Sequence, residues 1–208
     1  MKPLYLRVLP LCLLCALCTT SSAQSIQLGA KAGFGIANFV GDKNTDFNSK
    51  VTFVGGFPFS YEVNRNLVFT PEIVYAQKGA EALATIDNVP LELNFSVLYL
   101  EFPILAKYIF SPRRKITPIV TAGPVLSWNI DSRVRYNAVG SDTQFNEPDN
   151  SIKTLDYGVA VGGGVDFSWD LRRISIELRY TRGVTNLIDN KDDPKYNGVV
   201  ALTAGIGL

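Results

Sequence analysis

Alternation between apolar and small residues runs through the whole stretch from Thr154 to Trp169. One set of alternate positions is mostly large and apolar: Leu155, Tyr157, Val159, Val161, Gly163, Val165, Phe167 and Trp169. The positions between them hold Gly, Ala, Asp and Ser. Successive residues of a strand point to opposite faces, and this one is roughly three times as long as an ordinary strand of about 5–6 residues. Because a face in water has no need of such small residues, the pattern favours a strand that lines a narrow barrel.

The aromatic residues of this stretch lie near its two ends. Tyr157 to Phe167 spans about 33 Å along a strand, or roughly 23 Å at a tilt of about 45°. An outer-membrane barrel has an apolar band of about 25 Å that is flanked by aromatic girdles. The N-terminal segment aside, no apolar run reaches the about 20 residues of a membrane-spanning helix. The stretch therefore predicts a strand that crosses an outer membrane.

The same alternation predicts about eight strands, at 25–39, 51–63, 67–78, 95–110, 116–130, 154–169, 174–187 and 197–208. The connections are long at 40–50, 79–94, 131–153 and 188–196, and short at 64–66, 111–115 and 170–173. Outer-membrane barrels have short periplasmic turns and longer outside loops, and closure leaves no free edge in the membrane. We therefore predict an all-β fold, a single closed antiparallel transmembrane β-barrel in the outer membrane of a Gram-negative bacterium, with both termini in the periplasm.

Five prolines fit this prediction poorly, because proline cannot donate to a strand ladder. They are Pro58, Pro71, Pro103, Pro118 and Pro124. We expect them to lie at bulges, at strand ends beyond the membrane, or at boundaries that the pattern misplaces.

The N-terminus is typical of a secretory signal. Lys2 and Arg7 precede an apolar segment at 8–18, and small residues end at Ala23. We predict cleavage after Ala23, with a signal peptide at 1–23 and the barrel at 24–208. The alternatives are a lipoprotein cut before Cys18, which the large Leu17 disfavours, and an uncleaved helical anchor.

The composition narrows the chemistry. All three Cys lie within the first 18 residues and there is no His, so the mature chain would have no disulfide and no Cys/His metal site. A serine nucleophile activated by histidine is impossible without His, and no spacing singles out two carboxylates as a general acid and base. We therefore expect that the protein is not an enzyme and has no cofactor. A formal charge of +1 argues against nucleic acid as a partner.

Charged residues of both signs fall on the face that would line the lumen. They are Lys31, Glu62, Glu72, Lys78, Glu101, Lys107, Asp156, Asp166, Glu177 and Arg179. They could form a permeation path or a salt-bridged plug. Eight strands leave an interior just wide enough for side chains, and buried charges must be paired. We therefore predict a plugged lumen, with a small diffusion channel as the alternative.

The opposite face carries the aromatic residues that we expect in the lipid-facing girdle: Tyr61, Tyr108, Trp128, Tyr157, Phe167, Trp169 and Tyr180. Three further groups have two interpretations each. The basic turns at 113–115 and 172–173, with Arg65, could contact anionic headgroups or a periplasmic partner, or be solvated. Asp189, Asp192 and Asp193 could gather a cation, but a solvated loop is favoured. The loop at 131–153 could bind a partner.

Four segments resemble a known family: GAKAGFGIANFVG at 29–41, FTPEIVYAQKG at 69–79, LYLEFPILAKYIF at 98–110 and ITPIVTAGPVLSW at 116–128. They are similar to the small, PorT-like outer-membrane β-barrel family of Bacteroidota. The resemblance implies an outer-membrane barrel of that phylum, strand prolines as a family habit, and an association with type IX secretion. Leu208 departs from the usual terminal Phe. We predict a structural or interaction role, with outer-membrane lipid and periplasmic or surface proteins of a secretion or assembly apparatus as partners.

Overall fold

The computed structural model describes residues 26–41, 48–86, 89–112, 114–138, 144–148, 153–169, 172–186 and 195–207. These residues form nine strands: β1 Ile26–Gly41, β2 Lys50–Glu62, β3 Leu67–Ile86, β4 Val89–Ile109, β5 Ile116–Ala138, β6 Gln144–Pro148, β7 Leu155–Trp169, β8 Arg172–Gly183 and β9 Lys195–Gly207. Among the described residues, no helix is long and apolar enough to cross a membrane. The predicted cleavage site, Arg113, the three loop aspartates at 189–193 and Leu208 lie outside the described residues.

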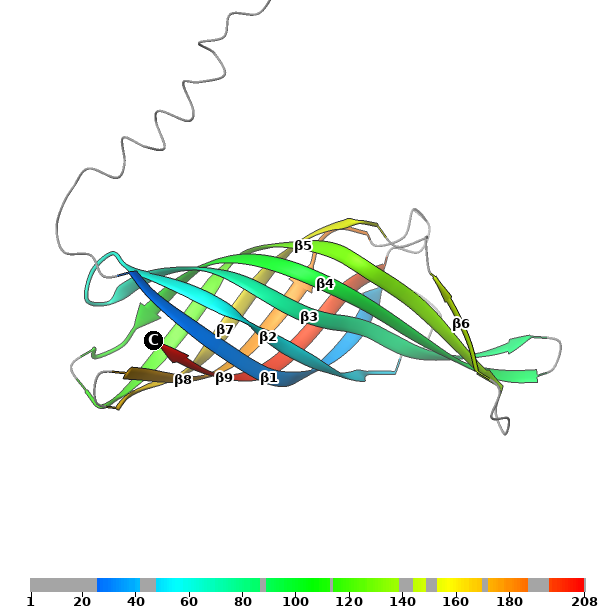
Figure 1. Ribbon diagram of the computed structural model, residues 1–208, viewed down its shortest axis with the longest axis horizontal. Coiled ribbons are helices and arrows are strands. Elements are labelled where there is room, and N and C mark those ends of the chain that lie inside the picture. Colours follow the sequence, from blue (N-terminus) through cyan, green and yellow to red (C-terminus); the bar gives the residue numbers. More distant parts are fainter. Residues whose placement is uncertain are drawn as a thin grey trace, which may run out of the picture.

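Eight of the strands close into an antiparallel barrel, as predicted (Figure 1). β1 pairs with β9 to complete the ring, and β5 pairs directly with β7. The short strand β6 is additional and pairs with β5 above the ring. The chain enters β1 and leaves β9 at one end of the barrel, because Ile26 lies opposite Tyr61 and Gly29 opposite Gly207. The turn at 63–66 and the described turn residues at 110–112 and 114–115 lie at this end, which we call the short-turn end.

At the other end, the strands run on through segments that we expected to be loops. β3 and β4 stay paired as far as Ile86 and Val89, so the long connection predicted at 79–94 is wrong. β5 likewise continues to Ala138 through the first part of the loop predicted at 131–153. The residues involved, 79–86, 89–98 and 131–138, form what we call the extension. Figure 1 shows it projecting away from the C-terminus.

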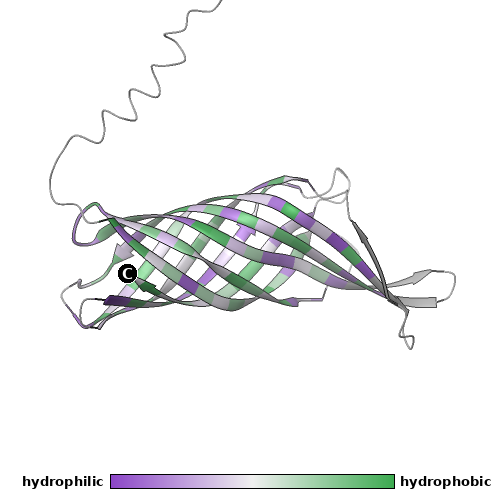
Figure 2. Cartoon of the chain, in the orientation of Figure 1, coloured by the Kyte–Doolittle hydropathy of each residue, from purple (hydrophilic) through white to green (hydrophobic). Residues whose placement is uncertain are grey.

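The polarity of the wall reverses in the extension. Below it, in what we call the band, large apolar side chains such as Val161 point outward and are exposed. In the extension, Phe95 points inward and packs on Phe39, while Arg133 points outward. The β3–β4 ladder keeps one register through both parts, whereas the β4–β5 ladder changes register between Leu98 and Tyr99. Because the outward residues of the extension are mostly polar, a search for apolar outward residues does not find it. Figure 2 shows hydrophobic and hydrophilic residues alternating along the strands.

Four of the prolines interrupt the ladder without disturbing the register. Pro58, Pro71, Pro103 and Pro124 each pair with the strand that follows, and the ladder to the preceding strand skips each of them. The register is the same on both sides of every gap, so these positions are neither bulges nor misplaced boundaries. Proline has no N–H to donate, so the ladder is interrupted only between each proline and its preceding strand. Pro118 lies near the start of β5, and its carbonyl accepts from Phe110 N at 3.0 Å.

Candidate functional site

The most concentrated set of charges lies across the middle of the lumen. Glu72 on β3 accepts from Lys31 Nζ at 2.6 Å and from Arg179 at 2.7 and 3.1 Å. Arg179 also binds Glu177, its neighbour on the inner face of β8, at 2.7 Å. All four side chains are almost fully buried. We call these residues the central ion cluster; it joins β1, β3 and β8 across the lumen.

A second layer lies toward the extension. Lys78 pairs with Glu101 at 2.6 Å and lies over the ring of Tyr99, 4.7 Å from its centroid. Asn197 Nδ2 donates to Tyr99 Oη at 3.2 Å and to Asp156 Oδ2 at 2.9 Å. Within the described residues, Asp156 Oδ1 has no hydrogen-bond partner. This layer, with Ser127 donating to Glu101 at 3.0 Å, closes the lumen a second time.

The third set of charges lies near the short-turn end and is more open. Asp166 Oδ1 accepts from Lys107 Nζ at 3.0 Å and from Ser175 Oγ at 2.7 Å. Arg173 lies 4.0 Å from Asp166 and 3.7 Å from Glu62. Glu62 was expected inside the lumen, but its side chain is 38 % exposed at the rim. Arg173 was expected in a turn, whereas it belongs to β8 and contributes to this set.

The small residues of β7 make room for the charges. A Cβ added to Gly162 would lie 2.6 Å from Glu177 Oε1 and 2.7 Å from Thr121 Oγ1. These two atoms form a 2.5 Å hydrogen bond in the space that the glycine leaves. The glycines and alanine of the inner face therefore reflect crowding in the lumen, as their small size predicted.

Two small cavities remain in the lumen, of about 70 and 30 Å³. They lie on either side of the central ion cluster, because Lys31 and Arg179 line both. A water needs about 10–15 Å³ by this kind of measure, so each cavity has room for a few waters. Among the described residues, no group of three or more Asp, Glu, His or Cys is placed to hold a metal.

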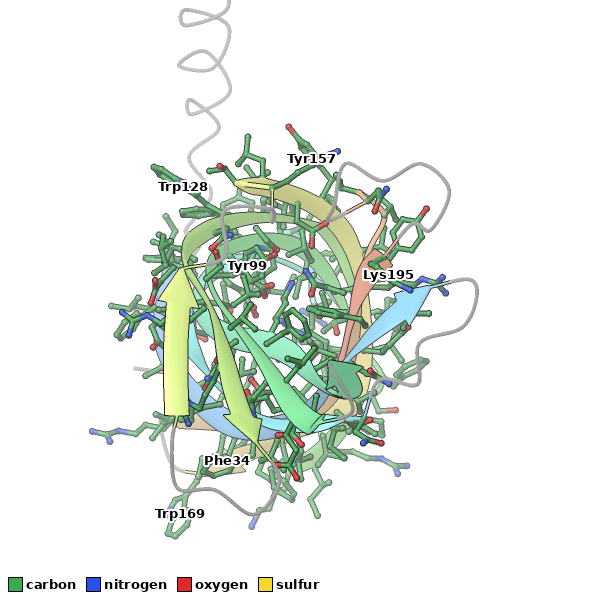
Figure 3. The ribbon with its side chains drawn as sticks, turned by 90° about the vertical axis from the view of Figure 1, so that its right-hand side faces the viewer. Phe34, Tyr99, Trp128, Tyr157, Trp169 and Lys195 are labelled. Atoms are coloured by element: carbon green, nitrogen blue, oxygen red, sulfur yellow. The ribbon has the colours of Figure 1, made fainter. Side chains whose placement is uncertain are left out.

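The aromatic residues expected in the girdle lie on the outward face. Tyr108, Trp128, Tyr157, Trp169 and Tyr180 are exposed, and Tyr61 and Phe167 are half-buried. Figure 3 looks at the barrel from the extension and shows Trp128, Tyr157 and Trp169 pointing away from the ring and Tyr99 inside it. Contact of these residues with a lipid interface stays a prediction.

Sequence reasoning assigned ten charged residues to the lumen, and the structure has nine of them inside and Glu62 at the rim. It missed two uncharged members, Tyr99 and Asn197. Both are buried. Tyr99 has the same strand parity as Glu101, and Asn197 the same parity as Thr203, so period-two alternation would have placed both inside. They were overlooked because the search was for charges.

Solved structures of other small barrels resemble this one. Neisserial surface protein A is 15% identical, with a TM-score of 0.48 over 87% of this chain and 97% of that chain. OprG from Pseudomonas aeruginosa is 11% identical, with a TM-score of 0.44 over 88% and 94%. The outer membrane enzyme PagL is 12% identical, with a TM-score of 0.44 over 83% and 97%. Among curated proteins, none matches the chain. A family model matches residues 22–189, and the chain belongs to that family, the outer membrane protein beta-barrel domain.

Proposed function

We propose that this outer-membrane barrel conducts no solute and has a structural or interaction role at the cell surface, as an accessory of protein secretion or surface assembly. Its termini lie in the periplasm and the extension lies outside. The orientation is supported by the short connections at the end where β1 starts and β9 finishes, since outer-membrane barrels keep their short turns in the periplasm.

The central ion cluster is the observation that supports a lumen closed to solutes. Glu72, Arg179 and Lys31 come from three strands and meet at 2.6–2.7 Å in the middle of the barrel. Removing one partner of a buried ion pair costs about 3–5 kcal/mol. A solute larger than water would have to break these contacts as it passed, so the cluster acts as a plug.

The extension supports the interaction role. Among the described strands, β6 pairs on one side alone, with β5, which leaves its other edge open. The upper part of β3, beyond the bridge between Asn48 and Glu81, likewise pairs with β4 alone. Open strand edges outside a membrane can pair with an extended segment of another protein. The resemblance to the PorT-like family of Bacteroidota supports a partner in secretion.

Conductance in planar lipid bilayers tests the closed lumen. We expect no current from the purified protein, and stepwise single-channel currents from it would contradict the proposal. Arg179→Ala/Lys78→Ala, which removes one cation from the central ion cluster and one from the second layer, is the matched variant and should conduct more than the native protein. The control is Arg65→Ala at the exposed turn, which should leave the conductance unchanged.

A small diffusion channel is the second candidate. It is favoured by one observation, the position of the two cavities directly above and below a single ion-pair layer. In this case the native protein itself would conduct, and Arg179→Ala/Lys78→Ala would enlarge a current already present.

A further inference from the structure

We propose that the outward face of the extension binds the phosphate of a lipid headgroup in the outer leaflet. The site consists of Lys50, Asn94, Ser96, Arg133 and Arg135, on β2, β4 and β5 (Figure 1). It rests on the proposed orientation, because the extension must lie outside for this leaflet to reach it.

The register places the site directly above the apolar band. Tyr75, Leu100 and Trp128 lie side by side on the outward face of these strands. Three rungs follow above this row, which pair Leu98 with Asp131, Ser96 with Arg133 and Asn94 with Arg135. On β4, Leu98 is the last apolar residue of this face before the polar Ser96. Apolar surface therefore gives way to cationic surface within a few residues.

The height of these rungs matches a headgroup layer. Ser96, opposite Arg133, lies two residues along β4 from Leu98, the last apolar residue of this face on that strand. That is about 7 Å along a strand, or roughly 5 Å along the membrane normal at a tilt of about 45°. The headgroup layer adds about 5–8 Å beyond the hydrocarbon on each side. A phosphate ester in this layer would thus lie beside Arg133.

A fixed cation lies at the centre of the site. Lys50 Nζ donates to Asn94 Oδ1 at 2.6 Å and to Ser96 Oγ at 3.2 Å. To reach them the side chain crosses β3 near Gly79, which lies opposite Ser96 and has no side chain of its own. The φ of Gly79 is +143°, so another residue would be strained there. These contacts hold the ammonium group over the middle rung.

The arginines can exchange their present contacts for phosphate. Arg133 Nε lies 2.9 Å from Asp131, but the two side chains are 67% and 45% exposed. Exposed pairs of this kind contribute about 0–1 kcal/mol. Charge-assisted bonds from a guanidinium to phosphate are shorter and stronger, and often bidentate. Three cations against one carboxylate give the lining a net positive charge.

The shape of the site also suits a lipid. A shallow pocket of about 480 Å³ lies over these residues. Tyr75 and Leu98 form part of its lining and are partly exposed. They offer apolar contact at the end nearest the band, and the cations offer charge at the other. This order matches the order of acyl chain and phosphate in a membrane lipid.

The test is retention of lipid by the purified full chain, measured by native mass spectrometry from mixed micelles. The probe is diphosphoryl lipid A, with fully dephosphorylated lipid A in its place as the comparison that has the same acyl chains and no phosphate. The native protein should retain lipid A in preference. The site variant Lys50→Gln/Arg133→Gln/Arg135→Gln should bind it at least about tenfold more weakly, because each lost charged hydrogen bond contributes about 1.5–3 kcal/mol. Inorganic phosphate should not displace the lipid, because it lacks the apolar part.

A matched control removes three positive charges at the short-turn end: Arg65→Gln/Arg114→Gln/Lys115→Gln. It should retain lipid A as the native protein does. Equal retention by the native protein and the site variant, an equal loss in the control, or displacement by inorganic phosphate would overturn the proposal. Arg133→Gln/Arg135→Gln alone changes exposed residues only, so a partial loss there shows the site in a variant that still folds.

This assay is independent of orientation and of conductance, because micelles present lipid to both ends of the barrel. Orientation is tested separately, by labelling single cysteines on intact cells with an impermeant maleimide. Asp142→Cys should react and Arg114→Cys should not. Reversed labelling together with lipid A retention would leave the phosphate site in place but move it to the periplasmic leaflet, which contradicts the outer-leaflet proposal.

Discussion

The band and the extension are built from the same strands but have opposite faces. In the band, Val161 points outward into the surroundings, and Glu72 is buried in a charged interior. In the extension, Arg133 points outward, whereas Phe95 and Ala80 pack inside on Phe39 of β1. The backbone ladder runs through both without a break on β3 and β4 beyond Gln77. This difference is expected if an apolar medium surrounds the band and a polar one surrounds the extension.

The largest effect should come from the interior of the band. Glu72→Ala would leave Lys31 and Arg179 facing each other with Glu177 as their one remaining counter-charge in the central ion cluster. We expect a loss of about 3–5 kcal/mol in the free energy of unfolding, measured by reversible denaturation in lipid vesicles.

The control for this substitution is Glu62→Ala at the rim, where the side chain is half-exposed and 3.7 Å from Arg173. It should cost no more than about 1 kcal/mol. Similar losses in the two variants would mean that the lumen is hydrated and that the contrast between its middle and its rim is false.

The next effect concerns the outward face of the band. Val161 is 57% exposed in the middle of β7, and Leu155 is 45% exposed where β7 begins. Val161→Arg should cost about 2–4 kcal/mol and Leu155→Arg about 0–1 kcal/mol, because a lipid-facing cation is costly at the midplane and cheap at the interface. The same vesicle assay ranks them. If Leu155→Arg is as harmful as Val161→Arg, the band is not in a bilayer.

An effect smaller than that of Val161→Arg should come from the same cation placed on the inward face. Thr203 is buried between the two lumen cavities and lines both. Thr203→Arg should cost about 1–3 kcal/mol through overpacking, because the cavities are too small for the side chain. Thr203→Ser, which adds no volume, is the control. A neutral Thr203→Arg would show that the lumen has room for more than water.

Alternation alone was sufficient to predict the eight strands of the ring and to assign most lumen residues to the inward face. It works because every strand in the band has an apolar outside, which imposes one period-two pattern on the whole wall. It failed in the extension, where the outside is water and the pattern is inverted. It also could not predict the ladder gaps at Pro58, Pro71, Pro103 and Pro124, since these depend on which neighbour each backbone N–H would face.

The sequence by itself determined which residues enter the lumen, because side-chain direction alternates along each strand. Only the tertiary structure decided which of them meet. Arg179 and Glu72 are separated by 107 positions and lie on strands that do not pair. Their contact depends on how far the strands are staggered around the closed ring and on its narrow diameter. The partners of Lys50 were decided in the same way, because its side chain crosses β3 to reach β4.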